Sequence, residues 1–298
     1  MALNLPLAVE PLVPPRSPRA RRVRVDRLLT HLVLSAASLA ILLPVLWTTR
    51  TSFAGRDLAY RPGDLWFSPT VANYRKIFVD QTFQTYLWNS LWIGAATAAV
   101  CLLLGSLAAY SIARFRTGGA PLSLAILGTQ MLPPVTLVIP LYLLIRQKIG
   151  LLGHDVTLID RGWTLVAVYL SFNLPFVVWI LVGFFQSIPR ELEEAARVDG
   201  AGQFQAFHQI VLPVSLPGLL AAGVFAFVLS WNEFLFALIL TGRESRTMPV
   251  ALASLMTSQG NQVGAICAAT IAMILPIVVL TWVIQRFLVR GLTFGAVK

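Results

Sequence analysis

The sequence predicts an all-α, polytopic membrane protein with about six transmembrane helices. Of its 298 residues, 57% are hydrophobic and only 12% are charged, whereas soluble domains carry about 25% charged residues. The mean hydropathy of the chain is +0.74. A helix needs about 20 apolar residues to cross the hydrocarbon core of a bilayer, and apolar runs of that length recur along the chain.

Residues 1–27 are predicted to form a disordered, basic cytoplasmic tail, because they are rich in Pro and Arg and lack helical periodicity. Their positive charge is of the kind that stays on the cytoplasmic side, beside anionic lipid. The chain has a net charge of +10, and six of its 23 Lys and Arg residues lie in this tail. That pattern does not favour nucleic-acid binding. The basic residues of the tail are Arg16, Arg19, Arg21, Arg22, Arg24 and Arg27.

The first apolar run, residues 28–49, is longer than the apolar part of a signal peptide and has no small-residue cleavage site. We therefore expect it to stay in place as a membrane helix. The sequence predicts five further spans at about 83–112, 120–145, 164–187, 215–241 and 263–287. Several contain Pro, and we expect kinks there, because neighbouring helices can bond the freed carbonyls.

The connections between the spans should alternate between the two sides of the membrane. With the tail inside, both termini are cytoplasmic. The connections that face the cytoplasm are then 113–119, 188–214 and 288–298. The connections that face outward are 50–82, 146–163 and 242–262. The inner segments carry a small excess of Lys and Arg, as the positive-inside rule requires.

The longest inner connection, residues 188–214, predicts a helix–turn–helix. Acidic residues open its first helix, where they favour the positive end of the helix dipole. Glu193 and Arg197 are spaced i,i+4 in the stabilising order. Gly200 suits the left-handed turn that ends a helix. A second short helix is expected over about Gln203 to Val211.

One face of the first helix carries Leu192, Ala195, Ala196 and Asp199, at helical spacing. Small alanine side chains allow another surface to approach closely, so the segment is typical of a knob that docks in a partner's groove. Shape alone leaves a second interpretation open, in which the segment is a surface loop that merely links two spans.

The segment that follows Arg190 resembles the EAA signature of ABC importer permeases, which fixes seven positions over 20 residues. The matching residues are Glu194, Ala195, Ala196, Gly200, Ile210, Leu212 and Pro213. The resemblance implies that residues 188–214 form a coupling helix, seated in a cleft of a separate ATPase subunit. Those seven residues, together with Asp199, are then the candidate ATPase-coupling residues.

Other stretches are similar to the carbohydrate-uptake group of these permeases, namely Asn73–Tyr74, Ala109–Phe115, Ile139–Tyr142, Gly150–Leu152 and Trp231–Phe234. The end of the chain, Gly291–Lys298, resembles the tail of the second permease of maltose-type transporters. This resemblance implies that Gly295, Ala296 and Val297 contact the ATPase dimer, and that residues 28–298 form one importer transmembrane domain.

The resemblance implies a permease subunit of an ATP-driven, binding-protein-dependent importer in a bacterial or archaeal cell membrane, with a sugar (a di- or oligosaccharide or a derivative) as the expected substrate. Substrate would enter the cytoplasm by alternating access. The implied partners are a second permease, two ATPase subunits, an extracytoplasmic substrate-binding protein and membrane lipid. Which sugar is carried stays open.

The chain itself carries no pattern for nucleotide or metal chemistry. It contains no Gly-Lys-Ser or Gly-Lys-Thr, so it lacks the phosphate-binding loop of ATPases. Cys101 and Cys267 lie in apolar runs without Cys or His at ligand spacing. We therefore expect no enzyme activity, metal or cofactor in this chain, with ATP and Mg²⁺ bound by the partner ATPase.

Asn232 and Glu233 are the candidate pathway or gate residues, because an ionisable group at membrane depth is costly and points to function. They either line the pathway and bind substrate hydroxyls, or bond to neighbouring helices and stabilise the bundle. Two other functions remain as alternatives to an ABC permease. One is a secondary transporter or channel driven by an ion gradient, and the other is a membrane scaffold without transport.

Overall fold

The computed structural model describes residues 18–55, 63–64, 66–80, 83–147, 149–151, 154–258 and 262–294. The chain divides into two compact units, residues 1–50 and 51–298. Within the described residues, the first unit consists of most of helix α1 (Pro18–Ser52). This helix begins earlier than the sequence indicates, so residues 18–27 are helical rather than part of a tail. Arg is a good helix former, and no Pro follows Pro18 until Pro44.

The second unit is almost entirely helical. In chain order its elements are α2 (Ala72–Arg75), η2 (Lys76–Asp80), α3 (Phe83–Phe115), α4 (Gly119–Thr129), α5 (Pro134–Ile145), β1 (Ile149–Leu151), β2 (His154–Val156), α6 (Gly162–Ser187), α7 (Glu191–Val198), α8 (Gln203–Ala206), η3 (Phe207–Val211), α9 (Leu212–Val214), α10 (Leu216–Trp231), α11 (Leu235–Leu240), α12 (Met248–Ser258) and α13 (Val263–Phe294). The elements η2 and η3 are wide, π-helical turns. The two strands pair antiparallel as a small hairpin, which the sequence did not indicate.

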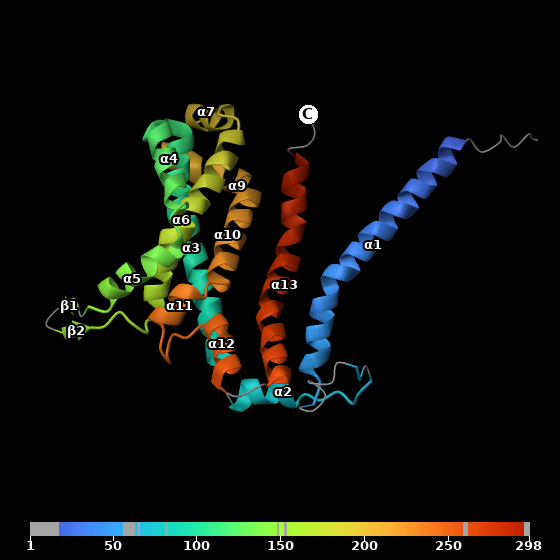
Figure 1. Ribbon diagram of the computed structural model, residues 1–298. Helices are drawn as coiled ribbons and strands as arrows, with labels where there is room; N and C mark the ends of the chain where they lie inside the picture. The colour runs from blue at the N-terminus through green and yellow to red at the C-terminus, as the bar shows by residue number, and fades with distance from the viewer. Residues whose placement is uncertain are drawn as a thin grey trace, which may run out of the picture. The chain divides into compact units, whose positions relative to one another are not determined.

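The core of this unit lies where α3 packs along α6 and α10, with α13 against α10 (Figure 1). Buried apolar side chains of α3, α6 and η3, among them Leu181, Phe185 and Val211, form its largest cluster. Small residues let the helices approach closely, as membrane helices require. A Cβ added at Gly105 of α3 would lie only 2.8 Å from a methyl group of Val177 in α6.

The fold class is confirmed, since the unit is built from apolar helices of membrane-spanning length. Among the described residues, four helical stretches are long and apolar enough to cross a membrane by themselves: residues 27–52, 83–115, 162–187 and 263–285. A fifth candidate is a bent pair, residues 203–214 followed by α10, with an angle of 77° between them. The bend lies at Ser215.

Two predicted spans are interrupted. The third, residues 120–145, is two helices, α4 and α5, because Pro133 and Pro134 cannot continue α4. The fifth, residues 215–241, breaks between Trp231 and Leu235, so that α10 and α11 are separate.

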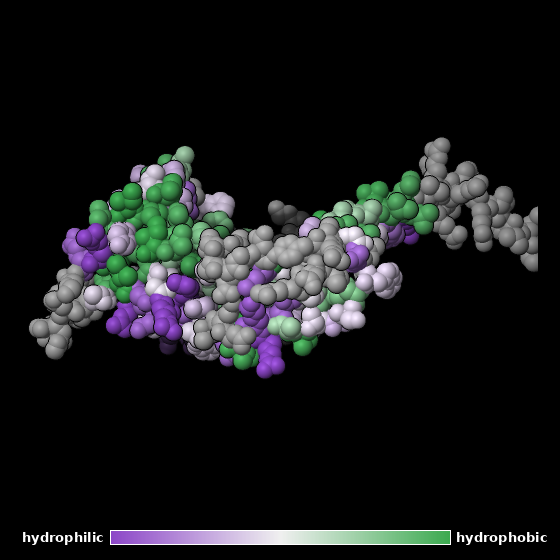
Figure 2. Space-filling view, turned by 60° about the horizontal axis from the view of Figure 1, so that its bottom comes forward, coloured by the Kyte–Doolittle hydropathy of each residue, from purple (hydrophilic) through white to green (hydrophobic). Residues whose placement is uncertain are grey.

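The connections that the sequence places on opposite sides of the membrane lie at opposite ends of this unit (Figure 1). The helix α7 and the C-terminal end of α13 lie at one end, and α2 and α12 at the other. Figure 2 turns this second end toward the viewer, and hydrophilic side chains gather on it beside a flank of hydrophobic ones. That separation is typical of a protein whose flank faces lipid and whose end faces water.

Candidate functional site

The connection between α6 and α10 folds as the predicted helix–turn–helix. Its first helix, α7, has three acidic residues in its first turn and Arg197 in its last, which suits the helix dipole at both ends. The helix stops at Gly200, whose φ of +89° lies in the left-handed region. The amide of Ala201 donates to the carbonyl of Ala196 at 2.9 Å and closes the turn.

The second part of the connection, α8, η3 and α9, runs as one continuous helical stretch. The amide of Gly202 donates to Oε1 of Gln205 at 2.7 Å and caps its start. Phe207 and Val211 are buried against the core of the unit. The predicted second helix, Gln203 to Val211, is therefore confirmed, and it joins α10 directly through α9.

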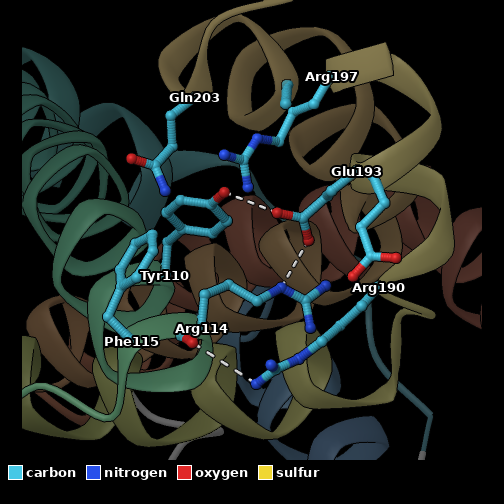
Figure 3. A pocket seen from close by; sticks show the side chains of 9 residues that line it. Tyr110, Arg114, Phe115, Arg190, Glu193, Arg197 and Gln203 are labelled. Carbon is cyan, nitrogen blue, oxygen red and sulfur yellow. Dashed lines mark hydrogen bonds and ion pairs between the residues drawn. The ribbon is translucent and has the colours of Figure 1, made fainter.

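A buried ion pair fixes α7 to the end of α3. Nε of Arg114 lies 2.5 Å from Oε1 of Glu193, and the hydroxyl of Tyr110 donates to Oε2 of Glu193 at 2.7 Å (Figure 3). Arg114 also donates from Nη2 to the carbonyl of Ile188, at 3.1 Å. Helical spacing favours Arg197 as the neighbour of Glu193, but the ion pair forms with Arg114 instead. The partner comes from another helix, because Glu193 faces inward and Arg197 does not.

Tyr110 joins both halves of the connection to α3. Its ring packs against the ring of Phe207 in η3, with centroids 4.6 Å apart, and against Phe185 near the end of α6. Tyr110 and Arg114 both lie in the stretch Ala109–Phe115, which the sequence singled out only for its family resemblance. Their spacing of four residues places both side chains on one face of α3. No pattern in the sequence indicates that this face meets Glu193.

The candidate coupling residues lie on the outer surface of the helix pair. The exposed members of the set are Glu194, Ala195, Asp199, Gly200 and Pro213. The partly exposed members are Ala196, Ile210 and Leu212. Two large apolar side chains that the sequence did not single out are also exposed there: Val198 at 87% and Phe204 at 70%. Exposed apolar groups in a cluster mark interaction surfaces. The third set of candidates, Gly295, Ala296 and Val297, lies outside the described residues.

A cavity of about 110 Å³ opens between α3 and the helix pair. Arg114, Arg190 and Arg197 line it together with Glu193 and Glu194 (Figure 3). Nη2 of Arg190 reaches the carbonyl of Arg114 at 3.5 Å. Three guanidinium groups beside two carboxylates give the lining of this cavity a mixed charge pattern that a partner of complementary pattern can recognise.

The gate candidates lie in the break between α10 and α11, and they differ in what they do. Oε1 of Glu233 accepts from the amide of Phe236 at 2.9 Å, and Oε2 accepts from the amide of Ala237 at 3.1 Å. Glu233 therefore caps the start of α11. Asn232 is exposed, and its Nδ2 donates to the carbonyl of Val228 one turn earlier, at 2.8 Å.

Nothing among the described residues forms a metal-binding group, since no three or more His, Cys, Asp or Glu side chains gather at ligand distance. The titratable group with the clearest shift outside the spans is Asp160. Burial alone would raise the pKa of its carboxyl, but hydrogen bonds from Ser245, Glu244 and Gly242 outweigh burial and lower the pKa to about 2. Asp160 thereby fixes the turn that leads from α11 to α12.

Residues 101–294 match the protein family described as "binding-protein-dependent transport system inner membrane component". The trehalose transport system permease protein SugB of Mycobacterium tuberculosis is 37% identical over 94% of this chain and 99% of that protein. The trehalose/maltose transport system permease protein MalG of Thermococcus litoralis is 32% identical over 90% of this chain and 96% of that protein.

A solved structure has a similar fold. It is a chain of a bacterial ABC transporter involved in the import of the acidic polysaccharide alginate. The two chains superpose with a TM-score of 0.72 over 91% of this chain and 99% of that one, at 21% sequence identity. At that identity the likeness concerns the fold alone.

Proposed function

The chain belongs to the family of binding-protein-dependent transport system inner membrane components and is a permease subunit of a sugar ABC importer, and we propose that its ATPase partner docks on α7. Membership of this family sets aside the ion-gradient transporter and the scaffold. The two relatives described above are named as permeases for trehalose and for trehalose/maltose. These names support a di- or oligosaccharide as the substrate that moves into the cytoplasm.

The observation that carries the docking proposal is the buried contact of Glu193 with Arg114 and Tyr110. It makes α7 a rigid extension of α3, one of the central helices of the unit. The opposite faces of α7 are exposed and carry Glu194, Ala195 and Asp199. A partner that holds these faces can therefore displace α3 and, through α9, also α10.

Alternating access requires a helix bundle with two arrangements, which the docked partner stabilises unequally. The bend of 77° between the connection and α10 suits such a movement. Ser215 at the bend keeps its hydroxyl bonded to the carbonyl of Val211. Closure of an ATP-bound ATPase dimer would thus change the angle at which α3 and α10 meet.

The remaining assignments follow from this arrangement. The chain would pair with a second permease, above two ATPase subunits that bind ATP and Mg²⁺. An extracytoplasmic binding protein would deliver the sugar, as supported by the alginate transporter structure that contains a periplasmic protein with a bound pentasaccharide. Residues 188–214 and both termini would be cytoplasmic, and Gly295, Ala296 and Val297 would reach the ATPases.

A bulky residue on the docking face tests the proposal. Ala195→Trp should block seating of the ATPase, so that the ATPase no longer co-purifies with the chain in detergent. Ala108→Trp is the matched control, because Ala108 is an equally exposed alanine on the flank of α3. Retention of the ATPase by Ala195→Trp, at the level of the control, would refute docking at α7.

A further inference from the structure

The two breaks in the predicted spans meet at one cavity. The break between α4 and α5 contributes Gln130 and Leu132, and the break between α10 and α11 contributes Glu233. The cavity has a volume of about 220 Å³ and is otherwise lined by α6, α10 and the adjoining ends of α4, α5 and α11. A helix broken at membrane depth frees backbone groups, which is tolerated only where they face protein or a water-filled space. Paired breaks of this kind mark substrate sites in other membrane transporters.

Polar side chains converge on the cavity from the break between α4 and α5, from α6 and from α10. Nε2 of Gln130 donates to the carbonyl of Phe172 at 2.7 Å, and Nδ2 of Asn173 donates to the hydroxyl of Ser230 at 2.8 Å. These bonds fix both amide groups. Among the hydrogen bonds between described residues, none uses the amide oxygen of Gln130 or of Asn173. Each amide therefore keeps an acceptor for a ligand.

A buried hydroxyl adds a second, independent observation. Tyr169 of α6 lines the same cavity as Glu233 and is 2% exposed. Within the described part of the chain, no group completes a well-aligned hydrogen bond with that hydroxyl. Both oxygens of Glu233 already accept backbone amides. A buried polar group without a bonded partner is costly, and a ligand hydroxyl between Tyr169 and Glu233 would remove that cost.

An aromatic wall completes the cavity. The rings of Phe172 and Phe236 stack with centroids 4.9 Å apart and an interplanar angle of 27°. A pocket with apolar aromatic walls and a few fixed donors and acceptors suits a neutral, polyhydroxylated ring, whose carbon–hydrogen faces pack on aromatics. A metal ion would need several carboxylates or carbonyls, and Glu233 is the sole acidic residue that the described part of the chain places in the lining.

We propose that this cavity is a subsite that holds one sugar ring of the substrate as it crosses the membrane. The proposal rests on the sugar-import function above and adds to it that this permease itself contacts the substrate. Gln130 and Asn173 would bind ring hydroxyls through their amide oxygens. Tyr169 would donate to a further hydroxyl, and Phe172 with Phe236 would pack against the ring.

The test compares Gln130→Leu with Gln147→Leu in the complete importer, reconstituted with its second permease, ATPases and binding protein. Gln147 is an exposed glutamine beyond α5 and outside the cavity. The readout is the number of labelled trehalose or maltose molecules imported per ATP hydrolysed. A substrate held less well should escape during the cycle, so this ratio should fall about tenfold in Gln130→Leu, as the loss of one hydrogen bond worth about 1.4 kcal/mol implies.

The yield of complete complex in detergent and its melting temperature should match the wild type in both variants, which separates a lost subsite from a damaged fold. Tyr169→Phe, which removes a single oxygen atom, should lower the same ratio and serves as the second variant. If both cavity variants import as much sugar per ATP as Gln147→Leu, the subsite is refuted and sugar import stands. If the wild-type complex imports neither sugar with ATP, the proposal of a trehalose- or maltose-type disaccharide as its substrate fails instead.

Discussion

The hydroxyl of Tyr110 donates a hydrogen bond of 2.7 Å to Oε2 of Glu193, a residue that lies 83 positions further along the chain. This bond, with the ion pair to Arg114, joins a central membrane helix to a short helix at the end of the bundle. Because the carboxylate is buried and bonded to both Tyr110 and Arg114, a displacement of α7 should carry the end of α3 with it. These contacts connect an exposed surface to the core.

Glu193→Gln should weaken this path. The substitution keeps the size of the side chain but leaves the guanidinium of Arg114 buried without its counter-charge, and breaking a buried pair in this way costs about 3–5 kcal/mol. We expect a lower melting temperature of the purified importer and reduced uptake. Glu191→Gln is the control, because Glu191 begins the same helix but is exposed. Equal melting temperatures for the two variants would contradict the assignment.

Gly200→Val should uncouple transport. A side chain at φ +89° strains the turn, by about 1–2 kcal/mol, so α7 and the second helix would lose their fixed relation. Gly202→Val is the matched control, since Gly202 has an ordinary φ of −69°. Membrane levels on immunoblots should be alike for both variants, and sugar uptake should fall only for Gly200→Val. Full uptake by that variant would count against a role for the turn.

Asp160→Asn should destabilise the end of the molecule opposite α7. The pKa of Asp160 is lowered from 3.8 to about 2, so its ionised form stabilises the folded protein fully above pH 3.8 and progressively less as the pH falls toward 2. After allowance for its partial exposure, the loss at pH 7 is about 1–2 kcal/mol. Thermal unfolding should show this difference for Asp160→Asn and almost none for the exposed control Glu244→Gln.

Glu233→Ala and Asn232→Ala should have unequal effects, although the sequence treats these neighbours alike. Loss of the Glu233 carboxylate leaves two amides at the start of α11 unbonded, and removal of such a cap costs about 1–2 kcal/mol. Asn232 bonds only within its own helix and is exposed. Hydrogen exchange at Phe236 and Ala237 should accelerate in Glu233→Ala alone; similar exchange in both variants would disprove the capping role.

The sequence predicted the parts of this fold that depend on local patterns. Apolar runs located the spans, and Gly200 located the turn between α7 and α8, because only a left-handed residue ends a helix in this way. The break at Pro133 and Pro134 has a signal in the sequence, since adjacent prolines cannot continue a helix. The surrounding apolar run is long enough for one span, however, and therefore predicts a single kinked helix.

Contacts between distant segments could not be predicted. The partner of Glu193 depends on how α3 packs against the connection, whereas helical spacing alone favours Arg197. The hairpin β1–β2 and the cavity between the two breaks depend likewise on packing. Asn173 and Gln130 are ordinary polar residues in apolar runs until the fold places them beside Glu233 and Tyr169.

The most direct measurement of the central claim is photocrosslinking from Val198, the most exposed apolar residue of α7. A photoreactive amino acid at this position, in the assembled importer in intact membranes, should form an adduct with the ATPase subunit and with no extracytoplasmic protein. An adduct with the binding protein, or labelling of a cysteine at this position by a membrane-impermeant reagent added outside the cell, would contradict the account.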